Sequence, residues 1–118
     1  MDRDHEIRTA QDRVIEKLLS RPDRRYTTSV TRAHIEEGLM CTATQDEHSV
    51  VMDLGRPMGG NAAGPSPSFF ARAAIAGCVA ICIKMTAARA GIALKNIAVD
   101  VETDHDNMAI FGNGANAA

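Results

Sequence analysis

Two cysteines, Cys78 and Cys82, are the residues of this 118-residue chain whose type and spacing most directly suggest chemistry. They are one helical turn apart, so a helix that contains both presents them on the same face. A cysteine thiolate acts as a nucleophile and is oxidised to a sulfenic acid by peroxides. Free cysteine also serves as a small buried apolar side chain, so packing is the alternative interpretation for both residues.

The spacing also limits what the two thiols can do together. Thiols one turn apart on a rigid helix are poorly placed for a mutual disulfide, because that bond requires specific directions of the Cβ atoms. A thiol in mid-helix gains little from the helix dipole, so a thiolate there needs a cation from elsewhere in the fold, such as Arg32 or Arg56. The third cysteine, Cys41, lies in a predicted strand and is expected to be buried.

The stretch that carries Cys78 and Cys82 is predicted to be one long helix from Pro67 to Ala90. Ser66 is a typical N-cap, proline is favoured at the first helical position, and Gly91 is a typical C-cap. The helix is apolar on nearly all sides, which predicts a buried central helix. A membrane span needs about 20 apolar residues, more than lie between Arg72 and Lys84, so we expect no membrane as partner.

The other segments predict an α+β protein with a single domain over residues 1–118. Apolar residues at helical spacing predict an amphipathic helix over Asp4–Ser20, within an N-terminal helical segment 1–22. An antiparallel meander is predicted from three stretches rich in Thr and Val: Tyr26–Ile35, Leu39–Gln45 and His48–Leu54. The segment Gly55–Pro65 is predicted to be a loop, Leu94–Asp104 a further strand, and 105–118 an irregular tail.

Composition excludes several classes of function. The net charge of -2 gives no reason to expect nucleic acid as a partner. The N-terminal residues lack the apolar core of a signal peptide, which favours a cytoplasmic protein with free thiols. The Gly-rich loop lacks the ending of a phosphate-binding loop, and the histidines show no metal-ligand spacing, so we expect no cofactor and no metal.

The central sequence resembles the OsmC/Ohr family of thiol-dependent hydroperoxide-resistance proteins. The resemblance runs from about Tyr26 to Asp104. It is carried by the loop Gly59–Pro67, by Ala76-Gly77-Cys78 in the helix, and by the end of the helix from Arg89 to Leu94. It implies an N-terminal β-meander packed on a long buried helix, with two chains intertwined into a homodimer and the active sites at the interface.

The resemblance also implies an activity. In catalytic members the helix cysteine, here Cys78, is the thiolate that attacks a hydroperoxide. A second thiol then resolves the sulfenic acid, and an external thiol restores the enzyme. The expected site residues are Cys78 as nucleophile, Arg32 as the nearest candidate for the activating arginine, and Cys82 or an outside thiol as the resolving partner.

The sequence departs from the family at three places, and these keep a second hypothesis open. Ser68 and Phe69 stand where the family has an acidic residue, and the turn Glu36-Glu37-Gly38 has no arginine. The family's resolving cysteine lies in a C-terminal region after the last predicted strand. We therefore expect either that the fold depends on strand pairing across the dimer or that the chain is a truncation. The alternative function is a non-catalytic dimer that binds a small apolar or thiol-reactive ligand.

Overall fold

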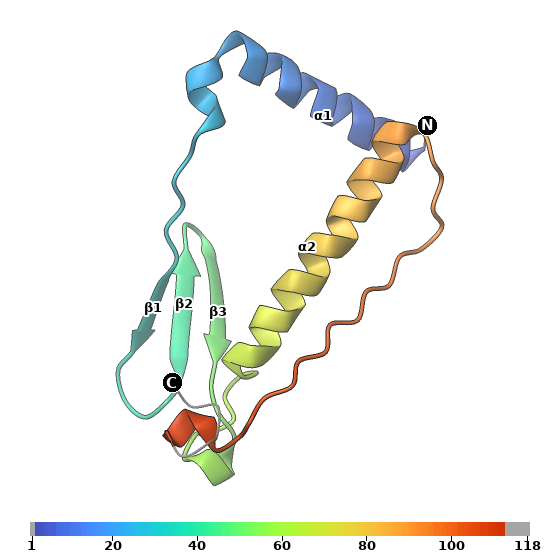
Figure 1. Cartoon of the computed structure of the whole chain (residues 1–118). Helices are drawn as coiled ribbons and strands as arrows, with labels where there is room; N and C mark the ends of the chain where they lie inside the picture. Colours follow the sequence, from blue (N-terminus) through green and yellow to red (C-terminus); the bar gives the residue numbers. More distant parts are fainter. Residues whose placement is uncertain (1, 113–118) are drawn as a thin grey trace.

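The architecture is α+β, as the sequence predicts (Figure 1). The protein is described from a computed structural model, which covers residues 2–112. Two helices and one three-stranded antiparallel sheet follow one another along the chain: α1 (Arg3–Ser20), β1 (Arg32–Ile35), β2 (Cys41–Gln45), β3 (His48–Met52) and α2 (Pro67–Ala90). Short 3-10 turns occupy Pro22–Arg25, Arg56–Met58 and Ala109–Phe111.

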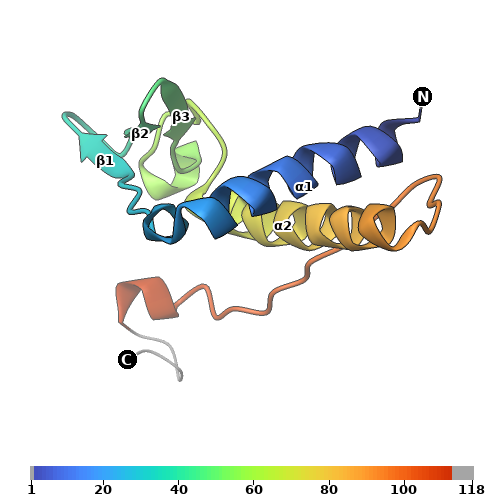
Figure 2. The same cartoon turned by 90° about the horizontal axis from the view of Figure 1, so that it is seen from above.

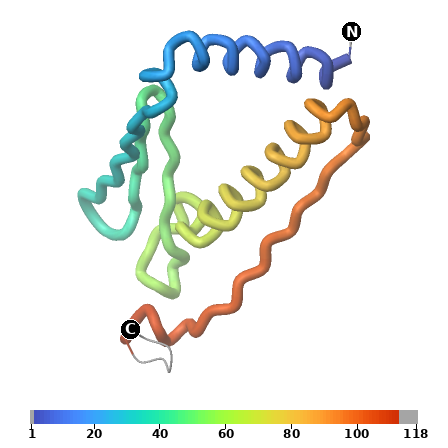
Figure 3. The backbone as a smooth tube through the Cα atoms, turned by 45° about the horizontal axis from the view of Figure 1, so that its top comes forward, coloured from blue at the N-terminus to red at the C-terminus, as the bar shows by residue number. Residues whose placement is uncertain are grey.

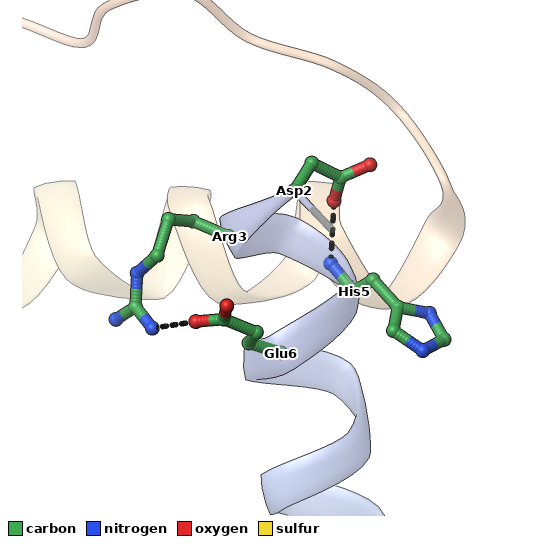
Figure 4. Close-up of polar contacts among 4 residues, drawn as sticks. All are labelled: Asp2, Arg3, His5 and Glu6. Carbon is green, nitrogen blue, oxygen red and sulfur yellow. Dashed lines mark hydrogen bonds and ion pairs between the residues drawn. The ribbon is translucent and has the colours of Figure 1, made fainter.

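The predicted N-terminal helix is present as α1, although none of its residues is buried in the single chain. The carboxylate of Asp2 caps the helix by accepting from the His5 amide at 2.8 Å, and Arg3 and Glu6 form an ion pair on the first turn (Figure 4). The helix lies against the C-terminal half of α2 (Figures 1 and 2). Two ion pairs join the helices there, Asp4 to Lys84 at 2.8 Å and Asp12 to Arg89 at 3.1 Å.

The predicted meander is present, in the order β1-β2-β3, but its strands are shorter than expected. Residues 26–31 are not a strand. Arg32, the first residue of β1, pairs with Thr44, and β2 ends one residue later at Gln45, so almost no β2 backbone remains for the preceding residues to pair with. The third strand ends at Met52, since the Asp53 amide instead donates to the Pro65 carbonyl at 3.1 Å.

The sheet has one apolar face and one polar face. The pairing Ala33–Ala43–Val50 and the pairing Ile35–Cys41–Met52 put six apolar side chains on one side. The opposite side carries mainly polar residues: Arg32, His34, Thr42, Thr44 and Ser49. Ile35 is 51% exposed and Val50 40% exposed, so the outer parts of the apolar face are uncovered within one chain, whereas Ala43 at its centre is buried.

The ends of α2 agree with the sequence signals. Ser66 accepts from the Phe69 amide at 3.3 Å, and Pro67 is the first helical residue. Gly91 ends the helix in the left-handed conformation with φ 74°, and the Ile92 amide donates to the Ala87 carbonyl at 2.8 Å.

The prediction that α2 is buried by its own protein is wrong for the single chain. Only Ala87 and Ala88, near the crossing with α1, are buried on this helix. Large apolar residues are open, among them Ile75 at 53% and Ile81 at 61% exposure. By length and composition α2 would also suffice to cross a membrane. Burial in a homodimer stays a prediction.

The predicted strand Leu94–Asp104 is not a strand in the single chain. The chain there is extended and runs back alongside α2 (Figures 1 and 3). Leu94, Ile97, Val99 and Val101 are half-buried and most of their neighbours are exposed, which is nearly the two-residue alternation expected of a strand. Among residues 2–112 no strand lies beside the segment, so no β-ladder with a described strand forms over residues 94–104.

The chain forms an open arrangement with little core (Figure 3). Its radius of gyration is 19.7 Å, whereas a compact domain of this length has about 13–14 Å. Over the described residues the buried apolar side chains are Ala43, Ala87 and Ala88. A single chain therefore leaves the sheet and α2 largely without partners.

The predicted irregular tail, 105–118, contains one short element. Ala109–Phe111 form a 3-10 turn, closed by Gly112 with φ 76°. The rest of the tail, 113–118, lies outside the described residues.

Candidate functional site

The two thiols of α2 lie together on its open side. Cys78 and Cys82 are both exposed and line one shallow groove of about 540 Å³. The other lining residues are almost all apolar and come from α2 and the segment after it: Val79, Ile83, Thr86, Ala87, Ala90, Ile92 and Leu94. The predicted pair is thus brought together, in an apolar setting that suits an apolar substrate or ligand.

Cys78 affects the titration of its neighbour Cys82. A hydrogen bond with Cys78 and the charge of the Cys78 thiolate raise the pKa of Cys82, and partial desolvation acts in the same direction. When the pair loses one proton, the second is therefore harder to remove. The arrangement suits one thiolate and one thiol better than two thiolates.

The cationic side chains of α2 are engaged elsewhere. Arg72 donates to the Thr103 hydroxyl at 3.0 Å, and Lys84 donates to the Leu94 carbonyl at 3.2 Å while pairing with Asp4. These contacts of Arg72 and Lys84 hold α2 against the extended segment that follows it and against α1. Within residues 2–112 of one chain, no lysine or arginine forms a hydrogen bond with Cys78.

The structure does not bring Arg32 to the thiols within one chain. Arg32 begins β1, the strand of the sheet farthest from α2 (Figure 1). The register places it opposite Thr44, on the polar face of the sheet. A role for Arg32 beside Cys78 stays a prediction that requires a second chain.

The third cysteine, Cys41, is half-buried rather than fully buried. It lies on β2 between Ile35 and Met52, on the uncovered apolar face of the sheet. Its predicted burial therefore depends on whatever covers that face.

The sequence analysis missed Asp53, the residue that organises the loop before α2. This buried carboxylate accepts from the amides of Leu54 at 2.7 Å, Asn61 at 3.2 Å and Ala63 at 3.2 Å. Gly60 approaches so closely that a Cβ would lie 2.0 Å from the Leu54 carbonyl oxygen. An acidic residue between an apolar strand and a Gly-rich loop full of free amides is the signal that predicts such a contact.

These contacts give Asp53 a shifted titration. Burial raises its pKa, but the amides of Ala63, Leu54 and Asn61 together outweigh burial and leave the pKa below its ordinary value of 3.8. A carboxyl with a lowered native pKa contributes stability that is complete above the ordinary value and is lost as the pH falls through the native one.

Replacing Asp53 by asparagine is expected to remove part of the acid sensitivity of folding. The wild-type melting temperature should fall as the pH is lowered from about 5 to about 3, in line with the carboxylate linkage. The Asp53→Asn variant should melt lower at pH 7 and change less over the acid range. Asp23→Asn, at an exposed position, is the control; an acid slope in Asp53→Asn equal to that of wild type would contradict the account.

Among residues 2–112, no group of three or more His, Cys, Asp or Glu side chains is placed to hold a metal ion. His34 instead contacts Glu36 at 3.4 Å on the exposed end of β1. The thiol pair of Cys78 and Cys82 is therefore the candidate functional site of the described residues.

The fold and the site together describe an α+β protein in which a Gly-rich loop leads into a long helix that carries a cysteine pair. A comparison with protein families agrees with this description. The family model described as OsmC-like protein matches residues 59–116, about half of the chain. This range contains Asn61 and Ala63, two of the loop residues whose amides bind Asp53, together with the whole of α2 and both helix thiols. The chain belongs to the OsmC-like family. No curated protein and no solved structure matches the chain.

Proposed function

We propose that this OsmC-like protein is a homodimeric, thiol-dependent peroxidase that reduces organic hydroperoxides in the cytoplasm. The observation that carries the proposal is the Cys78 thiol, exposed in an apolar groove on α2 that it shares with a second thiol, Cys82. The groove favours hydroperoxides with an apolar substituent over hydrogen peroxide.

The proposed chemistry needs one nucleophile and one outside reductant. The Cys78 thiolate attacks the terminal oxygen of the hydroperoxide, the O–O bond breaks, and the alkoxide leaves and takes up a proton. Cys78 becomes a sulfenic acid. An external thiol condenses with it and releases water, and a second external thiol displaces the first as a disulfide and restores the Cys78 thiol.

Cys82 fits a supporting role better than a resolving role. The neighbouring Cys78 raises the pKa of Cys82, which keeps the Cys82 thiol protonated. A disulfide between the two would require Cβ atoms about 3.5–4.5 Å apart, whereas side chains one turn apart on a helix have about 5–6 Å between them. The external thiol is therefore the resolving partner in this proposal.

The homodimer is supported by the uncovered apolar surfaces of one chain. Within residues 2–112 of one chain, much of the apolar face of the sheet, the thiol side of α2 and the backbone of residues 95–104 lack partners. Exposed apolar area of this extent indicates association. A second copy supplies matching surfaces for all three, because each chain carries both a sheet with free edges and an unpaired extended segment.

A lipid bilayer is a poorer cover for α2 than a second chain. Arg72 and Lys84 bind the extended segment and α1, so these parts would have to enter the membrane with the helix. The unpaired amides and carbonyls of residues 95–104 would each lose water there at a cost of several kcal/mol. A bilayer would also leave the apolar face of the sheet uncovered.

The test is consumption of cumene hydroperoxide by the reduced protein with dithiothreitol as the thiol. The proposal predicts multiple turnovers per chain and slower consumption of hydrogen peroxide. Absence of turnover, with cumene hydroperoxide or a related apolar compound bound reversibly in the groove, would instead support the second candidate, a non-catalytic binding protein. The observation that favours this candidate is the lack of a cation at Cys78 within one chain.

A further inference from the structure

The thiol pair of α2 offers two soft ligands and no third. Cys78 and Cys82 face the same groove, and the rest of its lining is apolar apart from Thr86. Among residues 2–112 no additional His, Cys, Asp or Glu joins them as a metal cluster. A zinc ion, which takes four ligands in structural sites, is therefore not matched by this pair.

The geometry of the pair disfavours a disulfide but suits a bridging atom. A disulfide brings the two sulfurs to about 2.0 Å, which the rigid spacing on α2 opposes. A single atom that bridges the two sulfurs requires a wider separation than a disulfide. With each bond about 2.3 Å long, the length known for a metal–thiolate bond, the two sulfurs are ~3.5 Å apart. Side chains one turn apart on a helix have Cβ atoms about 5–6 Å apart, so two thiols that line the same groove can reach this separation without unwinding the helix.

We infer that Cys78 and Cys82 form a dithiol site for monosubstituted trivalent arsenicals. Such a compound has one carbon substituent and two positions that exchange for thiolates, so two sulfurs complete its coordination. The groove places Val79, Ile83, Ile92 and Leu94 around the thiols, where they accept an apolar substituent. This inference does not rest on the proposed peroxidase function.

The reaction at the site involves no change of oxidation state. With phenylarsine oxide as the probe, each thiol gives up its proton and forms one As–S bond. The oxygen of the probe leaves with both protons as water, and arsenic remains trivalent. The protein therefore gains the phenylarsenic group and loses two hydrogens.

Intact-protein mass spectrometry of the reduced wild-type chain tests the site. Phenylarsine oxide is expected to add one phenylarsenic group per chain, which excess glutathione leaves in place and dimercaptopropanol removes. The two-point attachment should make retention against glutathione at least about 100-fold stronger than in Cys78→Ser or Cys82→Ser, each left with one of the two thiols. Cys41→Ser is the matched control and should behave as wild type.

Four outcomes would overturn the inference. One is equal retention in Cys78→Ser or Cys82→Ser, one is loss of retention in Cys41→Ser, and one is no adduct on a folded wild-type protein. A stoichiometry of one arsenic per two chains would likewise refute it, because it assigns the site to sulfurs from two copies. Circular dichroism, together with the variants Cys78→Ala and Cys82→Ala, separates loss of the site from loss of folding.

Discussion

Replacing Cys78 by serine is expected to reduce the consumption of cumene hydroperoxide to the uncatalysed rate. A hydroxyl cannot take the place of the thiolate that attacks the O–O bond, and loss of an enzyme's nucleophile costs a factor of 10³ or more, on the order of several kcal/mol in the barrier. Steady-state consumption with dithiothreitol, measured against wild type, gives this ratio.

The other two cysteines provide the controls for that result. Cys82→Ser should retain turnover at a reduced rate, because serine keeps a hydrogen-bond donor beside Cys78. Cys41→Ser, on the sheet, should retain the wild-type rate. Turnover that survives in Cys78→Ser, or that disappears only in Cys41→Ser, would show that the nucleophile has been assigned to the wrong residue.

Thermal stability is expected to increase with protein concentration. If a second copy covers α2 and the sheet, a hundredfold increase in concentration adds about 2.7 kcal/mol to the stability of the assembled state. For two chains of this length that corresponds to a rise of roughly 5–10 °C in melting temperature. Scanning calorimetry or circular dichroism between micromolar and hundred-micromolar concentrations measures the shift.

A pair of neighbouring substitutions locates the covered surface. Val50→Lys puts a charge on the apolar face of the sheet and should lower the melting temperature and weaken the assembly. Ser49→Lys puts the same charge on the polar face and should leave both nearly unchanged. Equal effects of the two would mean that the apolar face is not part of the interface.

The local features of the fold were predictable because they depend on residues close in sequence. The caps of α2 at Ser66 and Gly91 follow from the conformations that serine, proline and glycine favour. The hairpin between β2 and β3 follows from two stretches of β-forming residues joined by Asp46 and Glu47. The ends of α2 and the register of the hairpin thus depend on residues that are close together in the sequence.

The features that depend on distant parts were not predictable from the residues alone. The alternation of Ile97, Val99 and Val101 correctly indicates an extended segment, but not whether a strand lies beside it. The apolar character of α2 indicates a helix that requires cover, but not which surface provides it.

In the candidate site, too, the features that depend on neighbouring residues were predictable and those that depend on distant residues were not. The shared face of Cys78 and Cys82 follows from helix geometry, and the structure confirms it. Arg32 illustrates the limit, since its place relative to Cys78 depends on how sheets and helices of two chains meet. Asp53 was missed because its role depends on loop amides that only the folded chain brings to one carboxylate.

The most direct test of the account is amide hydrogen exchange over Ile97–Asp104 in the folded 118-residue protein. In one chain this segment has no strand beside it, so its amides are protected only if a second copy pairs with them. The account predicts slow exchange on alternate amides at high concentration, comparable with that of β2, and faster exchange on dilution. Exchange at the rate of an unfolded peptide, at concentrations where α2 and β2 are protected, would contradict it.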